Sequence, residues 1–193
     1  PILNIPLIEY AVNEAREAGI ERFIFVSSPE KKSILDYFKK DKKLESYLKK
    51  KNSNLLKGIE KNLISNDSLI EVVQEEPLGL GHAIWCARDY IDGPFAVILP
   101  DDLIISKVPC IKQMIDAYKV HKSNIIAIQE VDSVDISKYG VIDYDQNDKN
   151  YYFIKNMVEK PSANDSPSNL AIIGRYILSP NVLNFLSEKK VGF

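Results

Sequence analysis

Short runs of apolar, β-branched and aromatic residues alternate along the chain with longer segments whose apolar residues recur at helical spacing. The short runs predict strands and the longer segments predict helices. The predicted strands are 22–27, 68–74, 94–100 and 124–131. The predicted helices are 7–18, 29–40, 54–64, 79–90 and 110–121. Because strands that alternate with helices form mostly parallel sheets with right-handed crossovers, the pattern predicts an α/β fold with helices flanking the sheet.

The pattern changes from residue 139 onward. Residues 139–144 and 152–159 alternate around the polar segment 145–148, which is typical of a hairpin with a polar loop. The last predicted elements are a strand at 170–178 and a helix that starts within 180–186. The sheet is therefore expected to be mixed. The length of 193 residues suits one sizeable core, and no linker stands out, so we expect a single domain over 1–193.

Acidic and basic residues nearly balance, at 27 and 25, for a formal net charge of −2. This balance gives no electrostatic case for a nucleic-acid partner or an anionic membrane surface. No apolar run approaches the roughly 20 residues that a membrane-spanning helix needs. Residues 39–51 contain seven lysines, which is typical of a solvated helical face, with a binding patch as the alternative.

The two cysteines, Cys86 and Cys110, belong to no C-x-x-C or Cys/His pair, which argues against a zinc site. We expect buried, unreactive thiols in a reducing compartment such as the cytoplasm. No Ser-His-Asp or Cys-His set stands out, so a covalent nucleophile has little support.

Two adjacent carboxylates, Asp101 and Asp102, follow the apolar run at 94–100. Ligands of open α/β sheets bind beyond the carboxyl ends of strands, and carboxylates there can hold Mg²⁺. An acidic turn without a ligand is the alternative. Neighbouring residues of an extended chain point in opposite directions, so we expect one metal ligand, and Asp101 lies nearer the strand end.

A second candidate site begins at Gln74, where a strand ends, and continues through Gly79-Leu80-Gly81-His82 into a helix. Glycines allow a ligand to approach the backbone, and a helix N-terminus offers free N–H groups. The spacing matches neither a P-loop nor G-x-G-x-x-G, and a tight turn is the alternative. We expect His82 to cap or pack rather than to act as a base.

The third candidate is Glu159-Lys160 before Pro161, at the end of a predicted strand. A carboxylate can accept two sugar hydroxyls, and an ammonium can neutralise a phosphate. A surface ion pair is the alternative. Acidic, basic and backbone groups without a nucleophile favour phosphoryl or nucleotidyl transfer, in which positioning and charge neutralisation supply most of the rate.

Taken in order, these segments resemble the bacterial UTP–glucose-1-phosphate uridylyltransferase family, whose fold is the Rossmann-like nucleotide-diphospho-sugar transferase fold. The resemblance runs from end to end of the chain. The matching segments are 6–15, Gln74 with 79–83, 96–102, 139–143, 158–161 and 168–176.

The resemblance implies that the protein makes UDP-glucose and pyrophosphate from UTP and glucose 1-phosphate, with Mg²⁺. It implies that Gln74 hydrogen-bonds the uracil edge, with the backbone of Gly79 beside it, and that Asp101 binds Mg²⁺. It also implies a homo-oligomer, either a dimer or a tetramer.

For the sugar phosphate, the resemblance implies that Gly140, Glu159 and the backbone at Ala171 and Ile172 hold glucose. Lys160 would hold the phosphate as it attacks the α-phosphorus of UTP. The roles of Asp101, Glu159 and Lys160 agree with those argued from their residue types.

The family pattern extends beyond both ends of this sequence. It begins with a strand and a Gly-x-Gly-Thr-Arg loop, and it includes a second metal-binding Asp after Phe193. We therefore expect a chain truncated at both ends, with little or no turnover by itself. Two alternatives remain: thymidylyl or guanylyl transfer, and a non-catalytic subunit that binds sugar nucleotides.

Overall fold

The structure is a computed structural model that describes residues 2–3, 5–31, 33–51, 53–148 and 151–187. The chain forms two compact units, the first from 1–18 and 96–178 and the second from 19–95 and 179–193. Each unit draws on two separate stretches of sequence, so no linker composition marks the division. The single domain over 1–193 stays a prediction.

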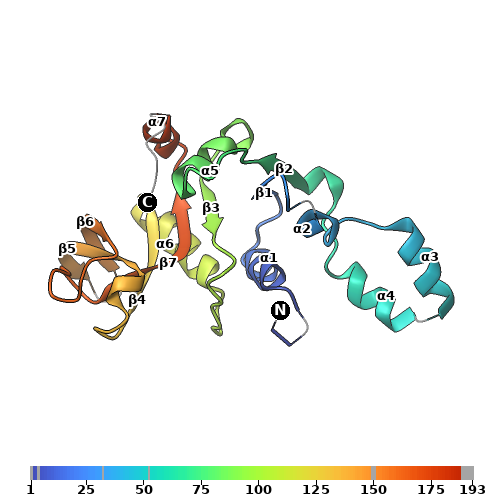
Figure 1. The fold of residues 1–193 in the computed structure, drawn as a ribbon, viewed down its shortest axis with the longest axis horizontal. Coiled ribbons are helices and arrows are strands. Elements are labelled where there is room, and N and C mark those ends of the chain that lie inside the picture. Colours follow the sequence, from blue (N-terminus) through green and yellow to red (C-terminus); the bar gives the residue numbers. More distant parts are fainter. Residues whose placement is uncertain (1, 4, 32, 52, 149–150, 188–193) are drawn as a thin grey trace. The chain divides into compact units, whose positions relative to one another are not determined.

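The sheet of the first unit is built around β7 (Leu170–Leu178). Its strand order is β3 (Phe95–Ile98), β7, β5 (Gly140–Asp148) and β6 (Tyr151–Glu159), and β4 (Ile125–Glu130) also pairs with β7. Figure 1 shows β7 between β3 and β4. The ladders of β7 with β4 and with β5 are antiparallel, as is the ladder of β5 with β6.

Two helices cover this sheet. Helix α6 (Cys110–His121) packs against β7 and β4, and α1 (Leu7–Glu17) packs against α6. Both helices bury apolar residues at helical spacing, as the periodicity predicts. These residues are Ala11, Val12 and Ala15 in α1, and Ile111, Met114 and Ala117 in α6.

The hairpin of β5 and β6 is longer than predicted. Its register pairs Gly140 with Glu159, Val141 with Val158 and Asp148 with Tyr151. The polar residues 145–148, predicted as a loop, therefore continue β5. Polar side chains are compatible with a strand here because most of β6 is exposed, and an antiparallel sheet can face water on one side.

The second unit contains a parallel pair of strands, β1 (Phe23–Ser27) and β2 (Leu69–Val73). The segment between them carries α2 (Ser33–Asp36), α3 (Lys42–Lys51) and α4 (Ser53–Glu60). The described lysines of α3 are exposed, which agrees both with the predicted solvated helical face and with a binding patch. These are Lys43, Lys49, Lys50 and Lys51.

The predicted helix at 29–40 is wrong over most of its length, because α2 spans Ser33–Asp36 alone. Phe38 is fully buried, and its ring lies 5.3 Å from that of Phe25. The Phe38 carbonyl accepts a hydrogen bond of 2.9 Å from the Ile64 N–H, not from a following helical turn. Burial of this side chain thus outweighs local helical periodicity.

The remaining helices of the second unit are α5 (Leu80–Cys86) and α7 (Val182–Leu186), which pack together. The predicted helix at 79–90 is shorter as an α-helix, because a 3₁₀ turn at Arg88–Tyr90 follows α5. No helix among the described residues is long and apolar enough to cross a membrane. The α/β fold is confirmed, and it contains both parallel and antiparallel strand pairs. They lie in two separate sheets, because β1 and β2 form a parallel pair in the second unit, whereas the ladders of β7 with β4 and β5, and of β5 with β6, are antiparallel.

Candidate functional site

The end of β3 is held against β7 at Gly174. The Leu99 N–H donates to the Gly174 carbonyl, and the Gly174 N–H donates to Oδ2 of Asp102, both at 2.8 Å. A Cβ at position 174 would lie 2.5 Å from Cβ of Leu99 and 2.7 Å from Oδ2 of Asp102. Only glycine permits this approach, so Gly174 sets where the acidic turn leaves the sheet.

The two carboxylates of this turn have different surroundings. Asp101 is exposed to solvent, whereas Asp102 is half-buried and lines a pocket. The adjacent side chains thus differ in environment, in keeping with the expectation that one of them serves a ligand. The structure assigns Asp102 to the pocket, while the predicted metal ligand, Asp101, lies outside its lining.

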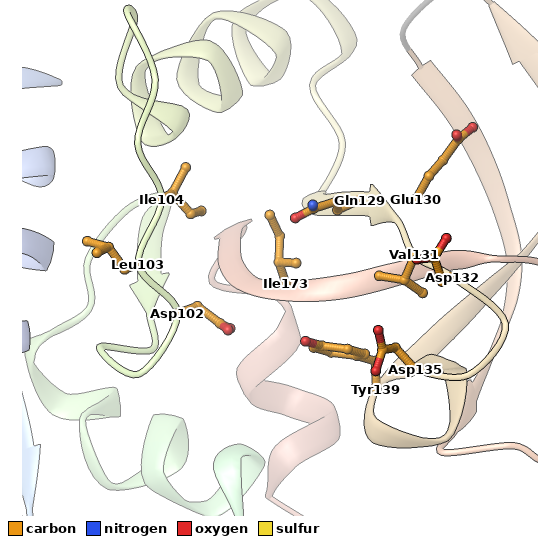
Figure 2. Close-up of a pocket in the computed structure, with 10 residues that line it drawn as sticks. All are labelled: Asp102, Leu103, Ile104, Gln129, Glu130, Val131, Asp132, Asp135, Tyr139 and Ile173. Atoms are coloured by element: carbon orange, nitrogen blue, oxygen red, sulfur yellow. The ribbon is translucent and has the colours of Figure 1, made fainter.

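The pocket has a volume of about 440 Å³. Figure 2 shows the Asp102 carboxylate and the Tyr139 hydroxyl pointing toward one another beneath Ile173. The lining residues are Asp102, Leu103, Ile104, Gln129, Glu130, Val131, Asp132, Asp135, Tyr139 and Ile173. Within the described part of the chain, no three His, Cys, Asp or Glu side chains come together as a metal site.

Gly140 leaves room for the carboxylate of Glu159. The two residues are register partners, and a Cβ at position 140 would lie 3.0 Å from Oε2 of Glu159. It would also lie 3.6 Å from Cδ1 of Ile172. Gly140, Glu159 and Ile172 therefore adjoin one another, as the resemblance implies, and Ala171 on the same strand is fully buried.

Lys160 has a backbone conformation that is unusual for a residue other than glycine. Its φ is 43°, and its N–H donates to the Tyr139 carbonyl at 3.1 Å. The left-handed region costs roughly 1–2 kcal/mol for such a residue. The side chain is 59% exposed, and its Nζ lies 3.6 Å from Oε1 of Glu159. This ion pair is weak because water screens it, so the ammonium remains available to a ligand.

Tyr176 lies on β7. Burial raises the pKa of its hydroxyl, and the negative charges of Asp102 and Glu159 raise that pKa further. Both carboxylates thus act on one hydroxyl group. The contacts of Asp102 with Gly174 and of Glu159 with Gly140 near Ile172 bring the acidic turn and the Glu159-Lys160 pair to neighbouring positions of β7.

Tyr176 and Tyr139 were not among the predicted site residues. The sequence position of each tyrosine could have indicated that it lies near the site. Tyr139 directly precedes Gly140, and Tyr176 lies two residues from Gly174 and four from Ile172 on β7. Alternate residues of a strand share one face, so Tyr176 lies on the same face of β7 as Ile172, which adjoins Gly140 and Glu159.

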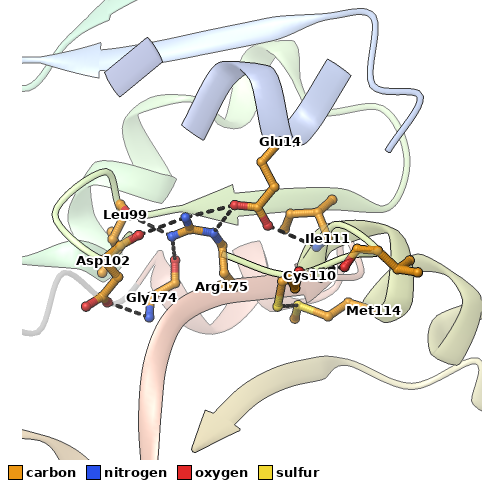
Figure 3. A network of polar contacts seen from close by, with 10 residues as sticks. Glu14, Leu99, Asp102, Cys110, Ile111, Met114, Gly174 and Arg175 are labelled. Atoms are coloured by element: carbon orange, nitrogen blue, oxygen red, sulfur yellow. Dashed lines mark hydrogen bonds and ion pairs between the residues drawn. The ribbon is translucent and has the colours of Figure 1, made fainter. Parts of the chain in front are cut away.

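A buried ion pair supports the acidic turn from within the unit (Figure 3). Arg175 is 1% exposed, and its Nε and one terminal nitrogen donate to Oε2 of Glu14 at 3.1 and 2.9 Å. The guanidinium also donates to the carbonyls of Leu99, Gly174 and Asp102, at 2.7, 3.3 and 2.9 Å. All five N–H donors of Arg175 are thereby used.

The other oxygen of Glu14 accepts a hydrogen bond of 3.1 Å from the Ile111 N–H, near the start of α6. Close by, burial and the Glu14 charge raise the pKa of the Cys110 thiol, while Arg175 lowers it. Cys110 therefore stays protonated at neutral pH. This matches the expected unreactive thiol, although Cys86 and Cys110 are both half-buried rather than fully buried.

In the second unit, the Gln74 amide is held between two partners. Its Nε2 lies 3.2 Å from the Gly79 carbonyl and 3.0 Å from Nδ1 of His82. Gly79 has φ 94° and ψ −179°, a conformation essentially restricted to glycine. Gln74 and Gly79 thus adjoin one another, as the resemblance implies. His82 packs beside them and does not cap the helix.

Comparisons with known proteins match the whole chain. The family model described as nucleotidyl transferase matches residues 1–192. A UTP–glucose-1-phosphate uridylyltransferase of Komagataeibacter xylinus is 41% identical over 193 residues, covering 99% of this chain and 68% of the relative. That of Bacillus subtilis (strain 168) is 43% identical over 195 residues, covering 100% of this chain and 66% of the relative.

Among solved structures, a UDP-glucose pyrophosphorylase complexed with UDP-glucose matches with a TM-score of 0.84 and 43% identity. The match covers 100% of this chain and 71% of that chain. The chain thus corresponds to about two thirds of the length of the proteins it matches.

We expect the Glu14–Arg175 pair to govern the stability of the first unit. Glu14→Ala leaves a buried guanidinium without its counter-ion and should lower the free energy of unfolding by about 3–5 kcal/mol. Denaturant unfolding of the intact protein measures this loss. The matched control is Asp116→Ala, which removes an exposed carboxylate paired with Lys112 and should leave the unfolding midpoint unchanged. Equal stability of the two variants would contradict the role assigned to Glu14.

Proposed function

The chain belongs to the UTP–glucose-1-phosphate uridylyltransferase family of nucleotidyl transferases, and on that premise we propose that it makes UDP-glucose and pyrophosphate from UTP and glucose 1-phosphate. The observation that carries the assignment of its site is that β7 lies beside both groups: the Gly174 N–H donates to Asp102, and Ile172 adjoins Gly140 next to the Glu159 carboxylate. The groups proposed to face the phosphates and the sugar thus both lie beside β7.

In the proposed reaction, a phosphate oxygen of glucose 1-phosphate attacks the α-phosphorus of UTP in line. A new P–O bond forms, the bond from the α-phosphorus to the bridging oxygen breaks, and pyrophosphate leaves. Lys160 neutralises the attacking phosphate. Its ammonium suits this task because it is exposed and paired with one carboxylate alone among the described residues. Positioning and charge neutralisation supply most of the rate in such transfers.

Glu159 accepts hydroxyl hydrogens of glucose, and Gly140 leaves the space that this contact needs. The support is the 3.0 Å that would separate a Cβ at position 140 from Oε2 of Glu159. The backbone of Ala171 and Ile172 completes the sugar contacts. A larger residue at position 140 would push the Glu159 carboxylate out of place.

The residues at the end of β3 fit a magnesium ion that is bound together with a triphosphate. Mg²⁺ prefers carboxylate, phosphate and water oxygens, and it is usually held by one or two carboxylates plus substrate phosphates. Asp101 offers an exposed carboxylate, and Asp102 lies next to it. Asp101 would hold the ion, which supplies positive charge to the phosphates when it is bound.

Gln74 and the backbone of Gly79 would recognise the uracil edge. The amide of Gln74 can pair with the polar edge of a base, and the lack of a side chain at Gly79 lets the base approach. We also propose a cytoplasmic enzyme that acts as a homo-oligomer, as the resemblance implies. The two free cysteines are compatible with that compartment.

We expect the intact protein to release pyrophosphate when UTP, glucose 1-phosphate and Mg²⁺ are supplied together. Omission of glucose 1-phosphate should abolish the release, because the sugar phosphate is the nucleophile. The same assay with dTTP or GTP tests thymidylyl and guanylyl transfer. A higher kcat/KM with either nucleotide than with UTP would refute the proposed uridylyl transfer.

Lys160→Ala should lower kcat/KM by roughly 10²–10³-fold, because the lost charge acts on the phosphate during transfer. The melting temperature should hardly change, because the side chain is 59% exposed. Lys155→Ala is the matched control, since Lys155 is 61% exposed on β6, which ends just before Lys160, and pairs with Asp143 and Asp145. If both variants kept normal turnover, Lys160 would have no part in the reaction.

Asp101→Asn should remove most of the activity and the response to Mg²⁺, because the amide is a poor ligand for a hard cation. Asp102→Asn should keep its Mg²⁺ response, since one oxygen of Asp102 is already bound to the Gly174 N–H. Initial rates across a Mg²⁺ titration distinguish the two variants. The reverse outcome would identify Asp102 as the ligand.

A further inference from the structure

The orientation of the Gln74 side-chain amide follows from its partners. The Gly79 carbonyl, 3.2 Å away, can only accept a hydrogen bond, so the atom facing it must be the NH₂ group. This carbonyl also accepts from the Ala83 N–H at 3.1 Å, which anchors it to α5. A flipped amide would place two acceptors against each other.

The tautomer of His82 follows from its contact with the same amide. The Gln74 NH₂ group lies 3.0 Å from Nδ1 of His82, so Nδ1 must accept and carries no proton. The ring proton therefore lies on Nε2, which faces Sγ of Cys86 at 3.7 Å. A neutral imidazole in this tautomer holds the second N–H of Gln74.

Both N–H donors of the Gln74 amide are thereby engaged within the second unit. Its Oε1 receives a hydrogen bond from none of the described residues, although the side chain is half-buried. The side chain thus presents a single acceptor. A half-buried acceptor is satisfied when a ligand supplies an N–H donor.

We propose that His82 is a positioning residue that fixes the Gln74 amide so that Oε1 meets the N3–H of uracil. This inference rests on the proposed function and adds how the base is selected. Uracil carries a donor at N3, whereas cytosine carries an acceptor there. An amide held with its oxygen outward pairs with the first and opposes the second. Without His82, the amide loses one of its two acceptors and is held by the Gly79 carbonyl alone, so turning to present NH₂ to cytosine costs less.

The test uses a matched pair of variants in the intact protein. His82→Asn and His82→Leu have side chains of similar shape, and the asparagine Oδ1 stands close to where Nδ1 stood. The leucine variant has no acceptor for Gln74. We expect the ratio of kcat/KM for UTP to that for CTP to fall at least about tenfold in His82→Leu and to stay near the wild-type value in His82→Asn.

The loss should appear in KM for UTP and in the Kd for UTP measured by calorimetry, with kcat nearly unchanged. A general loss of structure would lower rates with both nucleotides and leave their ratio unaltered. An unchanged UTP-to-CTP ratio in a folded His82→Leu variant overturns the inference while the proposed function stands. Wild-type protein that does not select UTP over CTP overturns the proposed function itself.

A second measurement needs no variant. Nitrogen NMR of the histidine rings in the wild-type protein reports which ring nitrogen carries the proton. We expect His82 to show a protonated Nε2 and an unprotonated Nδ1 at neutral pH. A proton on Nδ1 would remove the acceptor that orients Gln74 and would overturn the inference.

Discussion

The buried ion pair of Glu14 and Arg175 is the interaction on which the site of the first unit depends. A buried guanidinium is costly unless its charge and its N–H groups are all matched. Here one carboxylate balances the charge, and carbonyls of β7 and of the turn after β3 take the remaining donors. Helix α1, β7 and the acidic turn are therefore tied together by one side chain. The turn that carries Asp101 and Asp102 has little freedom to shift.

Two glycines, Gly174 and Gly140, shape the site because they carry no side chain. Gly174 lets the end of β3 approach β7, and Gly140 leaves room for the Glu159 carboxylate. Lys160 adds a strained backbone, held by the hydrogen bond of its N–H to the Tyr139 carbonyl. Strain of this kind persists when the surroundings determine the conformation, and it is concentrated at functional positions. The strained backbone of Lys160 thus accompanies the placement of its ammonium next to the Glu159 carboxylate.

The two units recognise their proposed ligands by different physical means. The first unit relies on charged groups at strand ends, which suit phosphates, a divalent ion and sugar hydroxyls. The second unit uses the neutral amide of Gln74, whose orientation comes from Gly79 and His82. Charges attract any phosphorylated ligand, whereas an oriented amide distinguishes one base from another. Selectivity for the base is therefore expected to come from the second unit.

Local patterns accounted for most of the elements, because helical and strand periodicity are properties of neighbouring residues. The helices at 7–17 and 110–121 and the strand at 170–178 match their predictions closely. The predicted helix at 29–40 was wrong over most of its length, because Phe38 is buried and its carbonyl accepts a hydrogen bond from the Ile64 N–H. The predicted polar loop at 145–148 was wrong because an exposed strand of a hairpin can carry polar residues.

The sequence by itself determined which residues can carry chemistry: the acidic pair after a strand, the Glu159-Lys160 step and the glycine loop after Gln74. Residue types and strand ends are enough for that. Only the tertiary structure decided that Asp102 lines the pocket, that Arg175 supports the acidic turn, and that His82 orients an amide. The partners of Arg175 include Glu14, which lies 161 positions away. Contacts across such distances depend on the packed fold, and periodicity within a segment carries no information about them.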